Sequence, residues 1–301
     1  MVDELPVDMV LEMREAVKQA DPDATLLGEV WEDASNKTAY GVNRSYCLGD
    51  MLDSVMNYPL RCAVIDFFTG VIDAYQLRRV ILHQQEVYPA PFYYSLMNLL
   101  GSHDRVRILN AMCGLNREGA AQMDRAEAKK ITLGKRELKS AKKRYLEAMK
   151  LLCALPGAPT VYYGDEIGMK YIDNLESVEG GYDRTGSRSP MQWDNSTNAG
   201  FSCAPSEKLY IPVDISKERP TVEQQKADDN SLYNEIKKLI KIRKSYKSLQ
   251  SKGEVEFICA EKHKYPFAYI RSFENEKILV IFNPSNNKQD FNLSLIHISE
   301  P

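Results

Sequence analysis

The sequence has few of the features that mark metal-binding or disulfide-linked proteins. Its cysteines are widely scattered, and none belongs to a Cys-x-x-Cys pair or to a His/Cys cluster at the spacing of zinc ligands. The six are Cys47, Cys62, Cys113, Cys153, Cys203 and Cys259. We therefore expect free thiols in a reducing compartment. We also expect no metal ligands and no cofactor, and the sequence leaves a bound calcium ion open.

Long apolar runs and a charge excess are absent as well. No stretch approaches the roughly 18 apolar residues that indicate a membrane span. Residues 1–20 lack the basic-then-apolar order of a signal peptide. The formal net charge is −3, with both signs spread along the chain, so no basic face predicts binding to nucleic acid or to an anionic membrane. These absences favour a cytoplasmic protein that binds a neutral or small polar substrate.

What the sequence does contain is an alternation of strand and helix patterns. Its 301 residues, 44% of them hydrophobic, suffice for one large domain and one small one. Apolar residues recur at helical spacing in four segments, namely 3–20, 60–87, 135–153 and 229–248. Short apolar runs that end in polar residues lie at 24–31, 52–57, 92–104 and 158–166. The alternation predicts a parallel α/β sheet with about half the strands of a closed barrel.

Two inserts and a C-terminal change of pattern complete the predicted organisation. Residues 115–136 and 171–228 are polar and predict long surface loops within a barrel domain that covers 1–250. After Ser251 the short β-type runs 254–259, 267–272 and 277–282 predict a partial antiparallel β domain over 251–293. Residues 294–301 end without a turn or a closing strand, which indicates a foreign or read-through tail.

Carboxyl groups stand at the ends of two predicted strands. Glu29 closes the first strand beside Trp31, a poorly solvated setting that favours a protonated acid. His103 and Asp104 close the third strand, about two strand–helix units later, so both sites project from the same rim. A strand-end Glu is often only a hydrogen-bond acceptor of a loop, and a His-Asp pair is often structural. Their convergence on one rim favours a catalytic site.

Five segments in the same order resemble signature regions of the α-amylase superfamily of glycoside hydrolases. Two of them carry the carboxyl groups, Leu27-Gly28-Glu29-Val30-Trp31-Glu32 and Asn98-Leu99-Leu100-Gly101-Ser102-His103-Asp104. The similarity continues through residues 53–59, 162–169 and 188–194 and covers nearly the whole chain up to the tail. Neopullulanases, cyclomaltodextrinases and α-glucosidases are the most similar members. The resemblance implies the C-terminal half, strands about 5 to 8, of a (β/α)8 TIM barrel, followed by part of a β-sandwich.

The resemblance also implies a retaining mechanism with three carboxyl groups. Glu29 would be the general acid and base, Asp104 would stabilise the charged transition state, and His103 would bind sugar hydroxyls. The family's nucleophilic aspartate lies in a segment of which only Met1-Val2-Asp3-Glu4 remains here. We therefore expect the nucleophile immediately before Met1, and we expect the isolated fragment to be inactive.

Other positions have two interpretations each. Glu4 corresponds to a residue on the acceptor side, or it only favours the dipole of a helix start. The resemblance implies that Trp31 stacks on sugar and that Arg184 closes the pocket around the terminal sugar, although a loop salt bridge would also explain Arg184. Arg105-Val106-Arg107 replaces the usual Thr-Pro-Arg, so a longer cation either crowds the mouth or pairs with a carboxylate. Asp165-Glu166 would be structural or would line a distal subsite.

The predicted substrate is an α-glucan with α-1,4 or α-1,6 glucosidic bonds, such as a maltooligosaccharide, a cyclodextrin or pullulan. Two alternatives remain on the same scaffold: a non-catalytic interaction domain, and an α-glucosyl transferase or isomerase. The presence of Glu29, His103 and Asp104 favours the enzyme. Bond specificity and a homodimer of the parent protein stay open.

Overall fold

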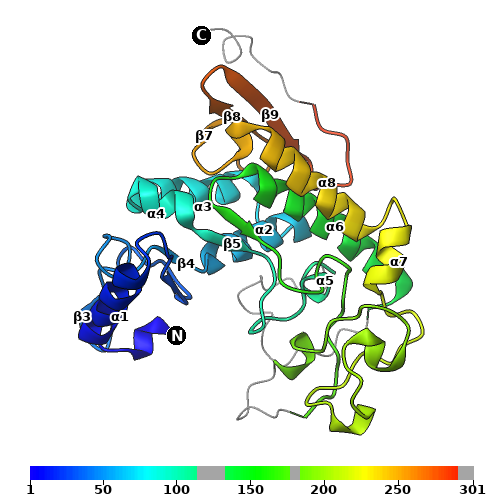
Figure 1. Cartoon of the computed structure of the whole chain (residues 1–301). Coiled ribbons are helices and arrows are strands. Elements are labelled where there is room, and N and C mark those ends of the chain that lie inside the picture. Colours follow the sequence, from blue (N-terminus) through cyan, green and yellow to red (C-terminus); the bar gives the residue numbers. More distant parts are fainter. Residues whose placement is uncertain (114–132, 177–183, 291–301) are drawn as a thin grey trace.

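Four short parallel strands form the centre of the protein. The computed structural model describes residues 1–113, 133–176 and 184–290 (Figure 1). Strand β1 (Leu27–Gly28) pairs with β4 (Ser54–Val55), and β5 (Met97–Leu99) pairs with β6 (Ala158–Thr160), both in parallel. A parallel bridge between Met56 and Met97 joins the two pairs, so the strands lie in the order β1, β4, β5, β6. The α/β fold class is therefore confirmed, with strands shorter than the predicted apolar runs.

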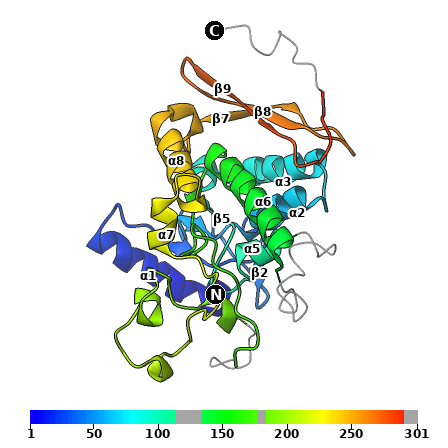
Figure 2. The same cartoon turned by 90° about the vertical axis from the view of Figure 1, so that its right-hand side faces the viewer.

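Helices connect and cover these strands. They are α1 (Val7–Ala20), α2 (Tyr58–Thr69), α3 (Ala74–Val87), α4 (Ala90–Ser95), α5 (Ile108–Ala111), α6 (Lys135–Ala154), α7 (Val222–Ala227) and α8 (Leu232–Ser245). Short 3₁₀-helices span Val2–Glu4, Thr185–Ser187, Thr197–Gly200, Ser206–Lys208 and Lys247–Leu249. A small hairpin joins β2 (Thr38–Ala39) to β3 (Val42–Asn43). In Figure 2, α6 and α8 lie side by side, and their buried apolar side chains belong to one core.

Several predicted boundaries were wrong. The single helix expected over 60–87 is two helices, because Gly70 takes a left-handed φ of 82° that ends α2. Asp73 and Gln76 then form a capping box that starts α3. The run expected as a strand from residue 92 begins as helix α4, which two prolines initiate.

The two predicted inserts were only partly irregular. Helix α7 and three 3₁₀-helices lie within residues 171–228, and α6 begins at Lys135, inside the range 115–136. Residues 114–132 and the predicted foreign tail 294–301 lie outside the described residues.

The C-terminal runs form one antiparallel sheet of β7 (Glu254–Cys259), β8 (Phe267–Phe273) and β9 (Glu276–Phe282). This sheet lies against the helical layer (Figure 2). The Phe67 and Phe267 ring centroids are 5.7 Å apart, and those of Phe68 and Phe282 are 5.8 Å apart. The three strands were predicted, and their buried residues Phe267, Tyr269 and Phe282 belong to the same hydrophobic core as the helices.

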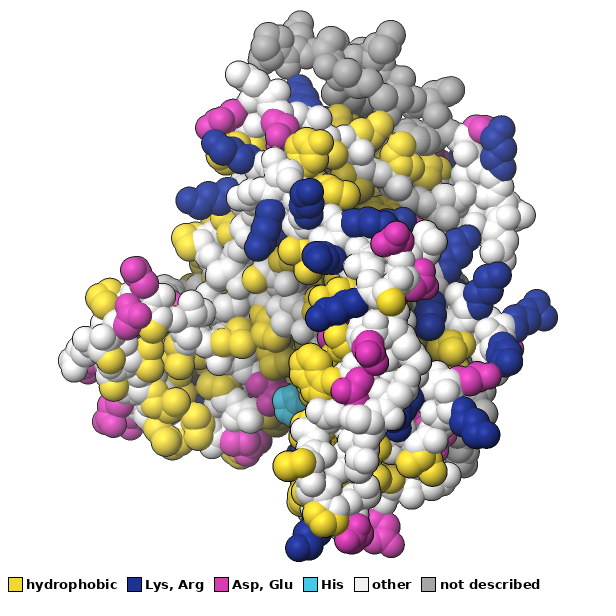
Figure 3. Space-filling view, turned by 45° about the vertical axis from the view of Figure 1, so that its right-hand side comes forward, with side chains coloured by type: hydrophobic (Ala, Val, Ile, Leu, Met, Phe, Trp, Pro, Cys, Tyr) yellow, Lys and Arg dark blue, Asp and Glu magenta, His cyan; other side chains and the backbone are white. Residues whose placement is uncertain are grey.

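The described surface carries charges of both signs. On the face drawn in Figure 3, Lys and Arg side chains are interspersed with Asp and Glu. In the part of the chain that the structure describes, every helix is too short or too polar to cross a membrane.

Arg271 in β8 joins the sheet to the end of α6. Its side chain is fully buried, and Nε donates to the Glu254 carbonyl at 3.1 Å. Nη1 donates to the Ala154 carbonyl, and Nη2 donates to the carbonyls of Gln250 at 2.6 Å and Gly253 at 2.9 Å. Burial lowers the pKa of Arg271 to about 10, which still leaves it charged at neutral pH. One cation therefore satisfies four backbone acceptors where the two layers meet.

Replacing this cation tests whether the sheet and the helices unfold together. Arg271→Met removes the side-chain donor from four backbone carbonyls where the two layers meet, so we expect a loss of about 3 kcal/mol in the free energy of unfolding. Urea denaturation followed by far- and near-ultraviolet circular dichroism should show one shifted transition. Lys252→Met, at an exposed position nearby, should change stability by less than about 0.5 kcal/mol. An unshifted midpoint for Arg271→Met would contradict this role.

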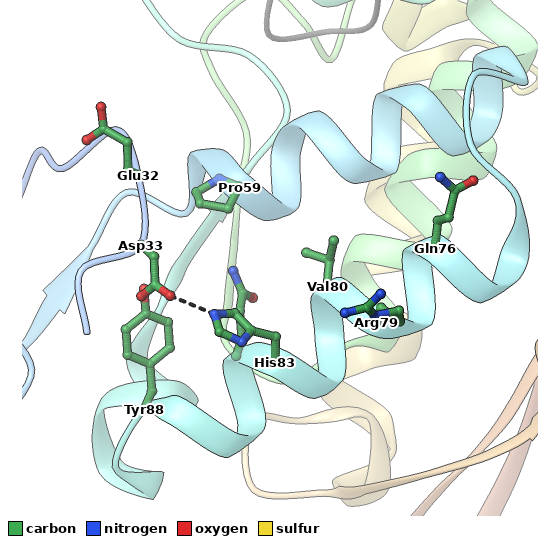
Figure 4. Close-up of a pocket in the computed structure, with 9 residues that line it drawn as sticks. Glu32, Asp33, Pro59, Gln76, Arg79, Val80, His83 and Tyr88 are labelled. Carbon is green, nitrogen blue, oxygen red and sulfur yellow. Dashed lines mark hydrogen bonds and ion pairs between the residues drawn. The ribbon is translucent and has the colours of Figure 1, made fainter. Parts of the chain in front are cut away.

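The loop after β1 is fixed to α3. The Asp33 carboxylate accepts from the Ser35 N–H at 2.8 Å and lies 2.7 Å from His83 Nε2 (Figure 4). The Tyr88 hydroxyl accepts from the Ala34 N–H at 2.9 Å. These residues stand at a surface cavity of about 570 Å³ between the loop and α3. The loop that carries Glu29 and Trp31 is thus anchored a few residues further along.

The anchor has a pH dependence. Burial alone would raise the pKa of Asp33, but the hydrogen bonds from Ser35, His83 and Tyr88 lower it below its usual 3.8. A carboxyl with a lowered folded-state pKa stabilises the protein above its unfolded-state pKa, and that stability is lost as the pH falls through the folded-state value. At pH 6 Asp33→Asn should cost about 1 kcal/mol of unfolding free energy, allowing for solvent screening. Urea denaturation should show this difference shrinking between pH 5 and pH 3, whereas Asp23→Asn should match the wild type throughout.

Candidate active site

Both carboxyl groups predicted from the sequence follow strands of the central sheet. Glu29 comes directly after β1, and Asp104 follows β5 after a short turn. Because the strands are parallel, their carboxyl ends lie on the same side of the sheet. Gly28 lets Leu52 pack against β1, since a Cβ there would lie 2.4 Å from Leu52 Cδ1.

The side chains of Glu29 and Asp104 meet. The carboxyl groups are near enough that Glu29 contributes to lowering the pKa of Asp104. The sheet therefore presents two carboxyl groups to the same space.

Asp104 is held ionised by cations. Its side chain is 7% exposed, and burial alone would raise its pKa. The charges of His103 and Arg184, and the hydrogen bonds from Arg188 and Glu29, lower that pKa instead. His103 Nε2 lies 3.2 Å from Oδ2, Arg188 Nη2 lies 2.8 Å from Oδ1, and Arg184 also pairs with Oδ1. Arg184 therefore reaches the site through a salt bridge with Asp104. A salt bridge was one of the two interpretations of Arg184 that the sequence left open.

Sequence analysis assigned no role to Arg188. Arg184 and Arg188 flank the 3₁₀-helix Thr185–Ser187, which presents both guanidinium groups to Asp104. Arg188 also donates from Nε to the His103 carbonyl at 3.1 Å. The spacing of four residues to Arg184 was visible in the sequence. The 3₁₀-helix that brings both guanidinium groups to Asp104 lies in a segment that was predicted as a loop.

Trp31 belongs to an aromatic stack. Its ring and that of Tyr58 are parallel within 1°, with centroids 4.4 Å apart. The Tyr58 hydroxyl lies 3.3 Å from Ser102 Oγ, which ties the stack to the turn before Asp104. The guanidinium carbon of Arg105 lies 4.0 Å from the Trp31 centroid. Sequence analysis did not identify Tyr58 as a site residue. The available signal was its position in the segment after β4.

Glu4 lies apart from the two carboxyl groups. Its carboxylate accepts a hydrogen bond from the Tyr40 hydroxyl in the turn between β2 and β3. The amino group of Met1 lies 3.6 Å from Glu29 Oε2. The first residues of the sequence therefore run beside Glu29, while Glu4 turns toward the hairpin.

Asp165 supports the site from beneath. It is 1% exposed, and its Oδ1 lies 3.3 Å from Arg107 Nη1. Burial raises the pKa of Asp165 to about 7, against the opposing charge of Arg107. A Cβ at Gly101 would lie 1.9 Å from Asp165 Oδ2, so only glycine lets β5 lead into Ser102 and Asp104 here. Among the described residues there is no cluster of three or more His, Cys, Asp or Glu side chains that could hold a metal ion.

Comparisons with known proteins place this geometry in a family. Residues 5–252 match the family described as alpha amylase, catalytic domain. The chain is 30% identical over 276 residues to a cyclomaltodextrinase of Geobacillus thermopakistaniensis (strain MAS1), covering 91% of this chain and 34% of that protein. It is 29% identical over 279 residues to neopullulanase 2 of Thermoactinomyces vulgaris, covering 92% and 35%.

A solved cyclomaltodextrinase structure superposes with a TM-score of 0.62 at 26% identity, covering 94% of this chain and 36% of that one. The chain spans about one third of the length of these relatives. The sequence match over residues 5–252 and the shared fold lead to one conclusion: the chain belongs to the α-amylase family of glycoside hydrolases.

Proposed function

We propose that this chain supplies the general acid and the stabilising carboxylate of a retaining α-glucan hydrolase. The observation that carries the proposal is the meeting of Glu29 with an ionised Asp104 at the carboxyl ends of parallel strands. Relatives named cyclomaltodextrinase, neopullulanase and maltogenic alpha-amylase support an α-glucan substrate. Maltooligosaccharides, cyclodextrins and pullulan, with α-1,4 or α-1,6 bonds, form the substrate class.

The two carboxyl groups have opposite tasks. Glu29 donates its proton to the glycosidic oxygen as the bond to the anomeric carbon breaks, and it later takes a proton from the attacking water. Asp104 stays ionised beside the positive charge that develops on the sugar ring. His103, whose side chain is 51% exposed, stands beside Asp104 within reach of sugar hydroxyls. Arg184 closes the same side of the site.

We infer that the nucleophile of this mechanism lies in a part of the relatives' length that this chain does not cover, since the chain spans about one third of that length. A carboxylate there would attack the anomeric carbon and form the covalent glycosyl intermediate, which water then hydrolyses.

The isolated chain should therefore not turn over α-glucosides. Loss of a covalent nucleophile commonly costs several orders of magnitude, since the intermediate cannot form. Purified residues 1–301 incubated with maltotriose, a cyclodextrin or p-nitrophenyl α-glucoside should release no product above buffer. Clear turnover that Glu29→Gln abolishes would show that the nucleophile lies within this chain.

In a longer protein that also carries the nucleophile, the two carboxyl groups can be told apart by the leaving group. Glu29→Gln should slow maltotriose hydrolysis by roughly 10²–10⁴-fold but aryl glucosides much less, because a good leaving group departs without protonation. Asp104→Asn should slow both substrates by roughly 10²–10³-fold, because the stabilising charge is lost in either case.

Steady-state and burst kinetics of the glycosylation step would measure this divergence. Glu32→Gln is the matched control, since Glu32 pairs with Lys37 on the surface and should leave both rates within about twofold. Equal slowing of both substrates by Glu29→Gln would reject its role as general acid.

A further inference from the structure

Arg105 is the position at which this sequence departs from the usual motif, and its side chain reaches the aromatic stack. The guanidinium carbon lies 4.0 Å from the Trp31 ring centroid and 5.2 Å from that of Tyr58. At these distances a cation is attracted to the electron-rich face of an aromatic ring. The sequence left open whether this cation crowds the mouth of the site or pairs with a carboxylate. In the structure it contacts the rings of Trp31 and Tyr58.

The distances decide which face of Trp31 the cation covers. The Trp31 and Tyr58 rings are parallel within 1° and 4.4 Å apart. A guanidinium on the opposite face of Trp31 would be separated from Tyr58 by two stacking layers, roughly 7 Å. The observed 5.2 Å excludes that arrangement. Arg105 and Tyr58 therefore lie on the same side of the indole.

Both partners of Trp31 are themselves held in place. The Arg105 carbonyl accepts from the Ser187 hydroxyl at 2.6 Å, and Ser187 is fully buried in the 3₁₀-helix between Arg184 and Arg188. Tyr58 is 1% exposed and lies 3.3 Å from Ser102 Oγ. The indole consequently has a fixed backing on one side, while Trp31 itself is only partly buried.

We propose that Arg105 is a positioning residue that, together with Tyr58, braces one face of Trp31 and leaves the opposite face to stack on a sugar ring of the substrate. The proposal rests on the proposed function, since it assigns the acceptor side of that site. Trp31 stands two residues after the proton donor, so the braced indole orients the sugar whose oxygen Glu29 protonates. Arg105 acts through Trp31 and touches no reacting atom.

The chain allows a direct test, because its only other tryptophan is Trp193. In full-length chain carrying Trp193→Phe, fluorescence reports Trp31 alone. A cation beside the indole attracts iodide and repels caesium, so it raises the ratio of iodide quenching to caesium quenching. Arg105→Thr should lower that ratio, whereas Arg105→Lys should retain it. This measurement needs no ligand and tests the contact itself.

Maltotriose titration then tests the consequence for the sugar. A cation–π contact at a partly exposed site is worth about 0.5–1 kcal/mol, which corresponds to a change of about 2–5-fold in affinity. Arg105→Thr should weaken maltotriose binding, measured by Trp31 fluorescence, by that factor. Arg105→Lys should stay within about twofold of the parent, as should Arg136→Thr at an exposed site on α6. Thermal unfolding of each variant controls for loss of fold.

The outcomes separate the two proposals. Tighter binding by Arg105→Thr would mean that the cation obstructs the sugar, and equal binding would mean that it does nothing; either result overturns the positioning role. Equal weakening by Arg105→Lys and Arg105→Thr would also overturn it. If maltotriose binds none of the proteins while the iodide effect is present, the contact is real, but the proposed function fails and the sugar-binding role fails with it.

Discussion

A carboxylate that is 7% exposed stays ionised only if cations compensate for its lost hydration, and the site depends on this constraint at Asp104. Arg184 and Arg188 supply the compensation from a segment far along the chain. That requirement holds the 3₁₀-helix Thr185–Ser187 against the end of β5.

Buried arginines connect the layers of this protein more generally. Arg107 pairs with Asp165 beneath the site, and Arg61 donates from Nε to the Leu100 carbonyl at 2.8 Å. Arg271 binds four carbonyls between the C-terminal sheet and the helices. A planar guanidinium suits this work because it remains charged when buried and offers donors in several directions. Each of these side chains fixes a loop or a strand end that hydrophobic contact alone would leave free.

The aromatic stack joins the loops that follow three strands. Trp31 follows Glu29, Tyr58 follows β4, and Arg105 follows Asp104. Their contacts bring three consecutive strand ends together. The anchor between Asp33 and His83 holds the same loop from its far side. The position of Glu29 is therefore supported from both directions along its loop.

The sequence by itself determined the order of strands and helices, the family and the two strand-end carboxyl groups. Apolar periodicity and residue order are local properties, so they can be recognised without a structure. It did not determine where a long helix would divide, because Gly70 and the Asp73 cap compete with an otherwise continuous pattern. Only the tertiary structure decided which cations reach Asp104, which face of Trp31 is covered and that the C-terminal sheet shares the main core. These features join residues far apart in the chain, and their geometry depends on packing that no local pattern records.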